Sequence, residues 1–102
     1  MAAIFRINES DVPWFEYEKA IRVKALTRNV AGVPPVQFVE YGPGHTDPMH
    51  SHDTDEFFIV TEGELYVDDT ANGPGSVVFI PRDTEYAVRA GDAGVRYFRV
   101  VV

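Results

Sequence analysis

Two histidines and a glutamate stand close together in the stretch GHTDPMHSHDTDEFFIVTEG, residues 44–63. His50 and His52 are two positions apart, so on an extended backbone both imidazoles project from the same face. Glu56 follows with the same parity. Two neutral imidazoles and one carboxylate form a ligand set that suits Fe, Mn, Zn, Ni, Co or Cu. The spacing indicates a candidate site for a divalent transition metal; the other interpretation is a pair of surface loop histidines.

The chain must fold back if these three residues are to meet. On a straight strand Glu56 would lie about 13 Å beyond His52, whereas metal ligands lie roughly 2.0–2.2 Å from their ion. Residues 53–55, Asp-Thr-Asp, are typical of a turn, because Asp side chains hydrogen-bond to nearby backbone groups. We therefore expect three donor atoms from one hairpin to converge on one cation.

The surrounding chain reads as short strands separated by turns. Alternating or apolar runs predict strands at 21–27, 36–41, 56–61, 64–68, 76–81, 85–90 and 95–102. Glu62-Gly63 is a hairpin candidate, and glycine-rich breaks lie at 42–44, 72–75 and 91–94. A helical turn is expected only within 9–19. This pattern predicts an all-β sandwich or barrel.

Both faces of the predicted strand 56–61 are apolar, because Phe58 lies on one face and Phe57 on the other. A strand that faces water on one side does not have this composition. We therefore expect its outer face to be covered, either by the N-terminal segment that holds Trp14 and Phe15 or by a second subunit. The second possibility predicts a homodimer.

Composition narrows the classes of partner. The chain has 102 residues, 45% hydrophobic and 25% charged, which is typical of one globular domain. Its formal net charge of -7 repels phosphate backbones and anionic lipids, so we expect no nucleic-acid or membrane partner. The absence of cysteine excludes disulfides and a thiol nucleophile and fits a reducing compartment. The first residues lack an apolar stretch of signal-peptide length, and we expect a cytoplasmic protein.

The histidine-containing stretch resembles the first signature of the cupin superfamily. That signature is a glycine, five residues, His-x-His, three or four residues, a glutamate, six residues and a glycine. Its five fixed positions correspond here to Gly44, His50, His52, Glu56 and Gly63, all in register. The resemblance implies an all-β, single-domain cupin β-barrel of the double-stranded β-helix or jelly-roll type. We expect residues 1–102 to form a single cupin domain, with an N-terminal arm at 1–19 and the barrel at 20–102.

The second cupin signature is matched only in part. Gly75 and Pro81 agree with it, whereas Asp83, Tyr86 and Ala90 replace its glycine, histidine and asparagine. In the family that histidine is usually a fourth metal ligand. Three roles are therefore open for Tyr86: a phenolate ligand, a neutral hydrogen-bond donor or acid–base group, or an amphipathic core residue of a metal-free barrel.

Four further residues are candidates for substrate contact. Phe58, Val60 and Val88 share strand parity with Glu56 or Tyr86, which predicts that they line the cavity wall, with plain core packing as the alternative. His45 is either a loop histidine or a contact at the barrel mouth.

Basic residues on two predicted strands are ambiguous. Arg22 and Lys24 alternate against an apolar face, which is typical of a solvated face; turned inward, they would hold a carboxylate. Arg96 and Arg99 have opposite parity, so one of them is expected to point inward, and the sequence does not say which.

We predict a small metal-dependent enzyme that acts on a small organic molecule inside the barrel. His50, His52, Glu56 and Tyr86 are the predicted metal ligands, and Tyr86 and Glu56 are also the predicted catalytic residues. The resemblance implies dioxygenases, decarboxylases, isomerases, epimerases, lyases or cyclases, and an open two-histidine, one-carboxylate set favours a dioxygenase. The alternatives are a non-catalytic metal- or small-ligand-binding module, a metal-dependent isomerase, lyase or cyclase, and a structural remnant without metal.

Overall fold

The structure is all-β, as predicted from the sequence. The computed structural model describes residues 3–102. In this range the elements are a 3-10 helix at Glu9–Asp11 and eight strands: β1 (Phe15–Glu18), β2 (Ile21–Ala25), β3 (Val36–Tyr41), β4 (Thr46–His50), β5 (Glu56–Val67), β6 (Thr70–Asn72), β7 (Val77–Ile80) and β8 (Tyr86–Val101). None of the helical structure in residues 3–102 has the length and apolar composition needed to cross a bilayer.

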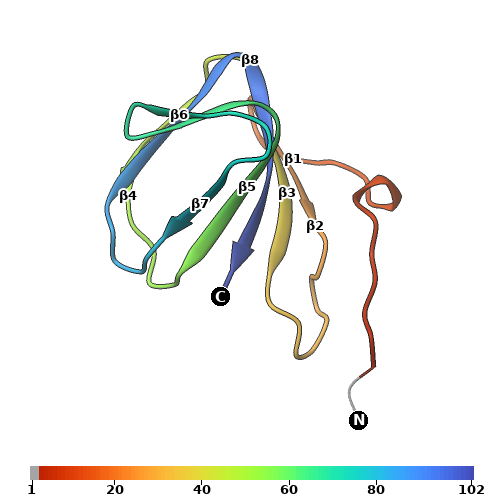
Figure 1. Cartoon of the computed structure of the whole chain (residues 1–102). Coiled ribbons are helices and arrows are strands. Elements are labelled where there is room, and N and C mark those ends of the chain that lie inside the picture. The colour runs from red at the N-terminus through yellow and green to blue at the C-terminus, as the bar shows by residue number, and fades with distance from the viewer. Residues whose placement is uncertain (1–2) are drawn as a thin grey trace.

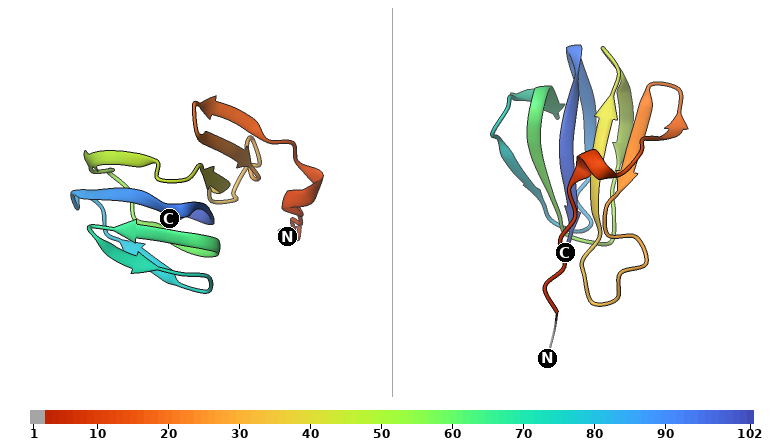
Figure 2. Two further views of the ribbon diagram at one scale, coloured as in Figure 1. Left: turned by 90° about the horizontal axis from the view of Figure 1, so that it is seen from above. Right: turned by 90° about the vertical axis from the view of Figure 1, so that its right-hand side faces the viewer.

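One antiparallel sheet contains all eight strands. Its order is β1-β2-β3-β8-β5-β6, with β4 also paired to β8 and β7 also paired to β5. In Figure 1 the sheet curls, so that β4 and β7 stand opposite β2 and β3, with β5 and β8 between them. The result is a barrel-like shell, and the N-terminal segment runs outside it (Figure 2).

Strands β5 and β8 are longer than predicted, because two glycines do not form turns. Glu62-Gly63 lies inside β5, and residues 91–94 lie inside β8. The register between β5 and β8 shifts on each side of Glu62-Gly63. Gly63 and Gly94 have φ values of 73° and 81°. A Cβ on Gly63 would lie 2.1 Å from the carbonyl oxygen of Gly94. These glycines therefore permit a close backbone approach at β-bulges, and the predicted hairpin and break are wrong.

Three short strands were not predicted. β4 lacks alternating apolar residues, and β6 has only three residues. β1 does alternate, since Phe15 and Tyr17 are each followed by a glutamate, but four residues are too few for periodicity to distinguish a strand from the expected helical turn. The helical turn expected within 9–19 is limited to Glu9–Asp11, and β1 occupies Phe15–Glu18.

The parity of the central strand is confirmed. Glu56, Phe58 and Val60 are buried, whereas Phe57 and Ile59 are partly exposed on the outer face. The outer residues continue across the sheet, because Phe57 pairs with Phe79 and Val100, and Ile59 pairs with Val77 and Phe98. We call these six residues the outer apolar patch.

The N-terminal segment covers a different part of the outer face. The Trp14 ring stacks on Phe38 of β3 at 5.5 Å between centroids. Cationic groups of Arg22, Lys24 and Arg96 lie 4.7, 4.7 and 5.4 Å from the same ring. Such cation–π contacts stabilise the packing of the segment on β2 and β3.

Candidate functional site

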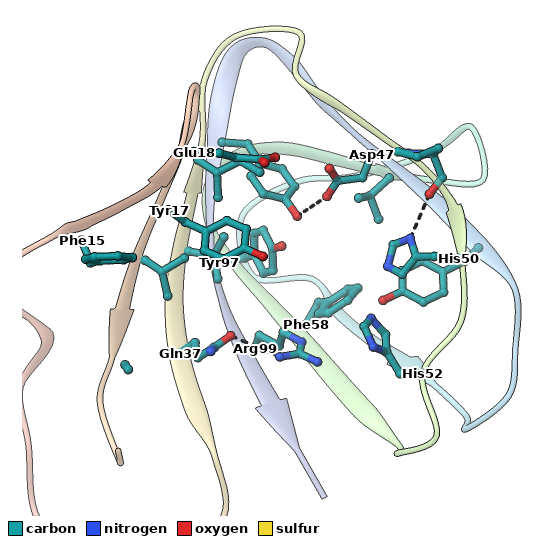
Figure 3. Close-up of a pocket in the computed structure, with 18 of the residues that line it drawn as sticks. Phe15, Tyr17, Glu18, Gln37, Asp47, His50, His52, Phe58, Tyr97 and Arg99 are labelled. Atoms are coloured by element: carbon teal, nitrogen blue, oxygen red, sulfur yellow. Dashed lines mark hydrogen bonds between the residues drawn. The ribbon is translucent and has the colours of Figure 1, made fainter. Parts of the chain in front are cut away.

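A cavity of about 640 Å³ opens on the inner face of the sheet. Figure 3 shows side chains from several strands directed into it. Its apolar and aromatic walls include Ile21, Val39, Tyr41, Phe58, Val88 and Tyr97, and its polar groups include Gln37, Asp47, His50, His52, Tyr86 and Arg99. An apolar cavity with a few polar groups is typical of a small-molecule site.

The two histidines reach this cavity from the end of β4. His50 is the last residue of β4, and His52 follows it in the connection to β5. Residues 53 and 54 form a bend, so the chain doubles back as expected. The backbone N–H of Asp83 donates to the His52 carbonyl at 2.7 Å, and the backbone N–H of Arg82 donates to Asp55 Oδ1 at 2.8 Å. The connection is thus fixed against the neighbouring β7–β8 loop.

Glu56 lies behind the cavity wall, and its side chain is completely buried. Its two carboxylate oxygens have different neighbours. Oε1 lies 3.6 Å from His52 Nε2 and 3.5 Å from the Tyr86 hydroxyl. Oε2 accepts a hydrogen bond from Arg99 Nε. Because an unpaired buried carboxylate is costly, the ion pair with Arg99 compensates the charge of Glu56, while Oε1 faces His52 and Tyr86.

Two of the predicted ligands, His52 and Glu56, lie close enough together to share a divalent metal ion, whereas the donor atoms of His50, His52 and Glu56 do not all lie within 4.8 Å of one another. His50 Nδ1 lies 2.9 Å from the Pro48 carbonyl oxygen. A carbonyl oxygen only accepts, so Nδ1 carries the proton and the lone pair of Nε2 is available. Two donors each roughly 2.1 Å from one ion lie at most about 4.2 Å apart. The separation of 3.6 Å between His52 Nε2 and Glu56 Oε1 is within that limit.

Tyr86 lines the cavity beside the predicted ligands. Its side chain is 2% exposed, and its ring centroid lies 4.6 Å from that of His50 and 5.9 Å from that of Phe58. Burial, followed by the charge of Glu56, raises the pKa of Tyr86, and the charge of Arg99 opposes this effect. The raised pKa keeps the phenol protonated at neutral pH.

The four predicted substrate contacts fall in different places. Phe58 and Val88 line the cavity. Val60 is 1% exposed and belongs to the hydrophobic core rather than to the lining. His45 lies beside the lining residue Asp47, with its Nε2 atom 3.0 Å from Asp47 Oδ1.

A second group of possible ligands was not predicted from the sequence. Among residues 3–102, Glu18, His45 and Asp47 are the one group of three whose donor atoms all lie within 4.8 Å of one another. The atoms of His50, His52 and Glu56 are less tightly grouped. Asp47 already accepts from Tyr41 at 2.7 Å through its other oxygen. Glu18 comes from β1, which is far from His45 and Asp47 in the sequence, so no local sequence signal links it to them.

The basic residues separate by face. Arg22 and Arg96 both bind Glu40 on the outer face, and Lys24 binds Glu9. The alternative that Arg22 and Lys24 line the barrel is therefore wrong. Arg99 is the arginine of β8 that lines the cavity.

Comparison with known proteins agrees with this architecture. The family model described as the cupin domain matches residues 37–101, which is more than half of the chain. The protein belongs to the cupin family, as the histidine signature predicts.

One curated protein is similar to this chain in sequence, and two solved structures are similar to it in fold. The dimethylsulfoniopropionate lyase DddW of Ruegeria pomeroyi is 36% identical over 64 residues, which cover 57% of this chain and 41% of the lyase. A chain of the Rhodobacter sphaeroides complex of SigE with the anti-sigma ChrR aligns with a TM-score of 0.79 at 18% identity, over 93% of this chain and 52% of that one. The polyketide cyclase RemF of Streptomyces resistomycificus aligns with a TM-score of 0.78 at 24% identity, over 97% of this chain and 78% of the cyclase. The chain thus spans about half or less of the length of the lyase and of the chain from the SigE–ChrR complex.

Proposed function

We propose that this cupin is a metal-dependent enzyme that acts on a small organic molecule in the cavity. His50, His52 and Oε1 of Glu56 are the proposed ligands of a divalent first-row transition metal. The observation that carries the proposal is the buried carboxylate of Glu56, whose Oε1 atom lies 3.6 Å from His52 Nε2 and 3.5 Å from the Tyr86 hydroxyl. Such an ion, when bound, supplies Lewis acidity and, if it is iron, redox chemistry with O₂.

The side chains around the proposed ligands have distinct roles. Tyr86 acts as a hydrogen-bond donor and proton donor to the substrate, because its raised pKa keeps the hydroxyl protonated. Phe58 and Val88 contact the apolar part of the substrate. Arg99 and Glu56 form an ion pair that holds the carboxylate in one orientation. His45 is proposed as a contact that acts through Asp47 at the cavity wall.

Among reaction classes, we favour a lyase. The support is the 36% identity with the dimethylsulfoniopropionate lyase DddW, over 57% of this chain. An elimination needs a group that exchanges a proton with the substrate and a cationic site that stabilises the developing negative charge. The proposed metal ion would supply the cationic site, and Tyr86, held protonated by its raised pKa, would donate a proton to the departing group.

A dioxygenase is the second candidate. Two histidines and one carboxylate form a set that leaves positions open for O₂ and substrate, and this composition favours oxygenase chemistry with iron. The two reactions differ in a simple observable: an elimination proceeds without O₂, whereas a dioxygenase consumes it. Turnover of small carboxylates and phenols under anaerobic and aerobic conditions, with an oxygen electrode, therefore separates them.

Metal content tests the proposal itself. We expect the purified protein, or the protein reconstituted with Fe²⁺, Mn²⁺ or Zn²⁺, to hold near one metal ion per chain by mass spectrometry. His50→Ala and Glu56→Gln should each lose it, because each removes a ligand. His45→Ala is the matched control, since it changes a histidine of the second group and should retain the metal. Loss of metal in His45→Ala alone, or a parent protein that takes up none, would overturn the proposed site.

A further inference from the structure

Strand β8 contains three arginines, and two of them, Arg96 and Arg99, bind a carboxylate on opposite faces of the sheet. Arg96 donates from Nε to Glu40 Oε2 at 2.8 Å on the outer face. Arg99 donates to Glu56 Oε2 on the inner face and from Nη1 to Gln37 Oε1 at 3.2 Å. The chain therefore contains a cavity arginine together with an outward arginine in a similar ion pair.

Arg99 is held in a fixed orientation by its neighbours. It pairs with Gln37 of β3 on one side and with Phe58 of β5 on the other. Its side chain is 24% exposed and lines the cavity. Figure 3 shows it between Gln37 and Phe58, on the same side of the cavity as His52. The guanidinium group is thus rigidly placed before any ligand arrives.

The two known contacts use only part of this group. A guanidinium has five N–H donors in a planar fork, and Glu56 and Gln37 accept one each. Among residues 3–102, Nη2 of Arg99 donates no hydrogen bond to a protein acceptor. A planar fork with free donors matches the two oxygens of a carboxylate.

The charge near Arg99 would favour an anion once a divalent ion is bound at Glu56. The positive charge of Arg99 balances the buried carboxylate of Glu56, so the ion pair is neutral as it stands. A divalent ion on the same carboxylate would add two positive charges. The acidic residues of the lining, Glu18 and Asp47, belong to the group around His45.

We propose that the cavity binds a small organic carboxylate and that Arg99 anchors it through the guanidinium edge that Glu56 and Gln37 leave free. The apolar body of the ligand would lie against Phe58 and Tyr97, which line the cavity beside the anchor. This inference deepens the proposed function and rests on it for the role of the cavity as a substrate site.

Benzoate is a suitable probe, with benzyl alcohol as its uncharged counterpart. We expect calorimetric titration of the Zn²⁺-loaded protein to detect benzoate and to show much weaker binding of benzyl alcohol. Arg99→Lys keeps a positive charge beside Glu56 but loses the fork, and should weaken benzoate binding about 10- to 100-fold. The matched control Arg96→Lys makes the same change on the outer face of β8 and should leave the affinity unchanged.

Several results would overturn the inference. These are equal benzoate affinity in the parent and in Arg99→Lys, equal affinity for benzoate and benzyl alcohol, or an equal loss in Arg96→Lys. If Arg99→Lys does not fold, the arginine Nε–H resonances of the parent decide: benzoate should shift that of Arg99 and not that of Arg96. A titration without Zn²⁺ distinguishes this inference from the proposed function. If the protein takes up no metal but still binds benzoate through Arg99, the carboxylate anchor is supported and the metal-dependent enzyme is rejected.

Discussion

The hydroxyl of Tyr86 lies 3.5 Å from Glu56 Oε1, in the position where the cupin signature has a histidine. Its raised pKa opposes the phenolate form, and burial of the whole ring beside His50 gives it a packing role as well. A neutral phenol next to the proposed ligands donates a hydrogen bond more readily than it binds a cation. Of the three roles left open by the sequence, we therefore favour the proton donor.

Tyr86→Phe tests this assignment. The substitution retains the ring that packs on His50 and Phe58, so we expect the protein to fold and to keep its metal. Activity should fall about 10²- to 10⁴-fold, the usual effect of removing an acid–base group. Metal content and turnover are measured on the same preparation. If the metal is lost, or if an Fe(III)-loaded parent is coloured by a phenolate band that the variant lacks, Tyr86 is a ligand instead.

For single residues, spacing in the sequence predicted some of the candidate site residues and not others. His50, His52 and Glu56 were predicted from their spacing in the sequence, and the bend at residues 53 and 54 places His52 Nε2 3.6 Å from Glu56 Oε1. Arg99 could not be distinguished from Arg96, because charged and apolar residues occur on both faces of the last strand. Only the register with β3 and β5 determines which arginine faces the cavity.

Among the elements, β5 and β8 determine the shape of the barrel. Each strand crosses the sheet as one piece, and β8 contributes both Tyr86 and Arg99 to the cavity from its opposite ends. Gly63 and Gly94 permit this continuity, because each lies at positive φ and contacts backbone where a side chain would lie. The final glycine of the histidine signature thus has a structural role.

Gly63→Ala should destabilise the protein by at least about 2 kcal/mol, because the methyl group would overlap the Gly94 carbonyl and the backbone conformation disfavours it. Gly73→Ala is the matched control. Gly73 has no heavy atom within 4 Å of an added Cβ and no positive φ, so its substitution should change the free energy of unfolding by less than about 1 kcal/mol. Urea unfolding monitored by circular dichroism measures both. Equal stability of the two variants would contradict our account of the bulge.

The sequence predicted most strands but misjudged their ends. Val36–Tyr41 was predicted with its observed bounds, because a proline pair precedes it and a Gly-Pro-Gly break follows. Gly63 and the glycines of 91–94 were interpreted as turns, since local sequence does not distinguish a turn from a bulge within a longer strand. The group of Glu18, His45 and Asp47 depends on long-range pairing and had no local signal.

For the whole molecule, the outer apolar patch bears on assembly. Val77 is 61% exposed and Phe79 is 48% exposed, and both pair with apolar residues of β5. The N-terminal segment does not serve as the predicted cover, because Trp14 lies on Phe38 and Phe15 lines the cavity. Exposed contiguous apolar surface is typical of an interaction site, which keeps the predicted homodimer as our proposal.

We predict that the protein is a dimer in solution and that Phe79→Glu makes it monomeric, because a charge in the patch cannot be paired within an apolar interface. Sedimentation velocity gives the mass of each species. Met49→Glu is the control, since Met49 is 61% exposed on β4, outside the patch. A monomeric parent, or a dimer that persists in Phe79→Glu, would rule out this interface.

The packing of Trp14 has a practical consequence. It is the single tryptophan of the chain, and its ring lies between Phe38 and the cationic groups of Arg22, Lys24 and Arg96. Its fluorescence therefore reports on the docking of the N-terminal segment against β2, β3 and β8. Detachment of that segment can be followed optically while the barrel remains intact, without any introduced label.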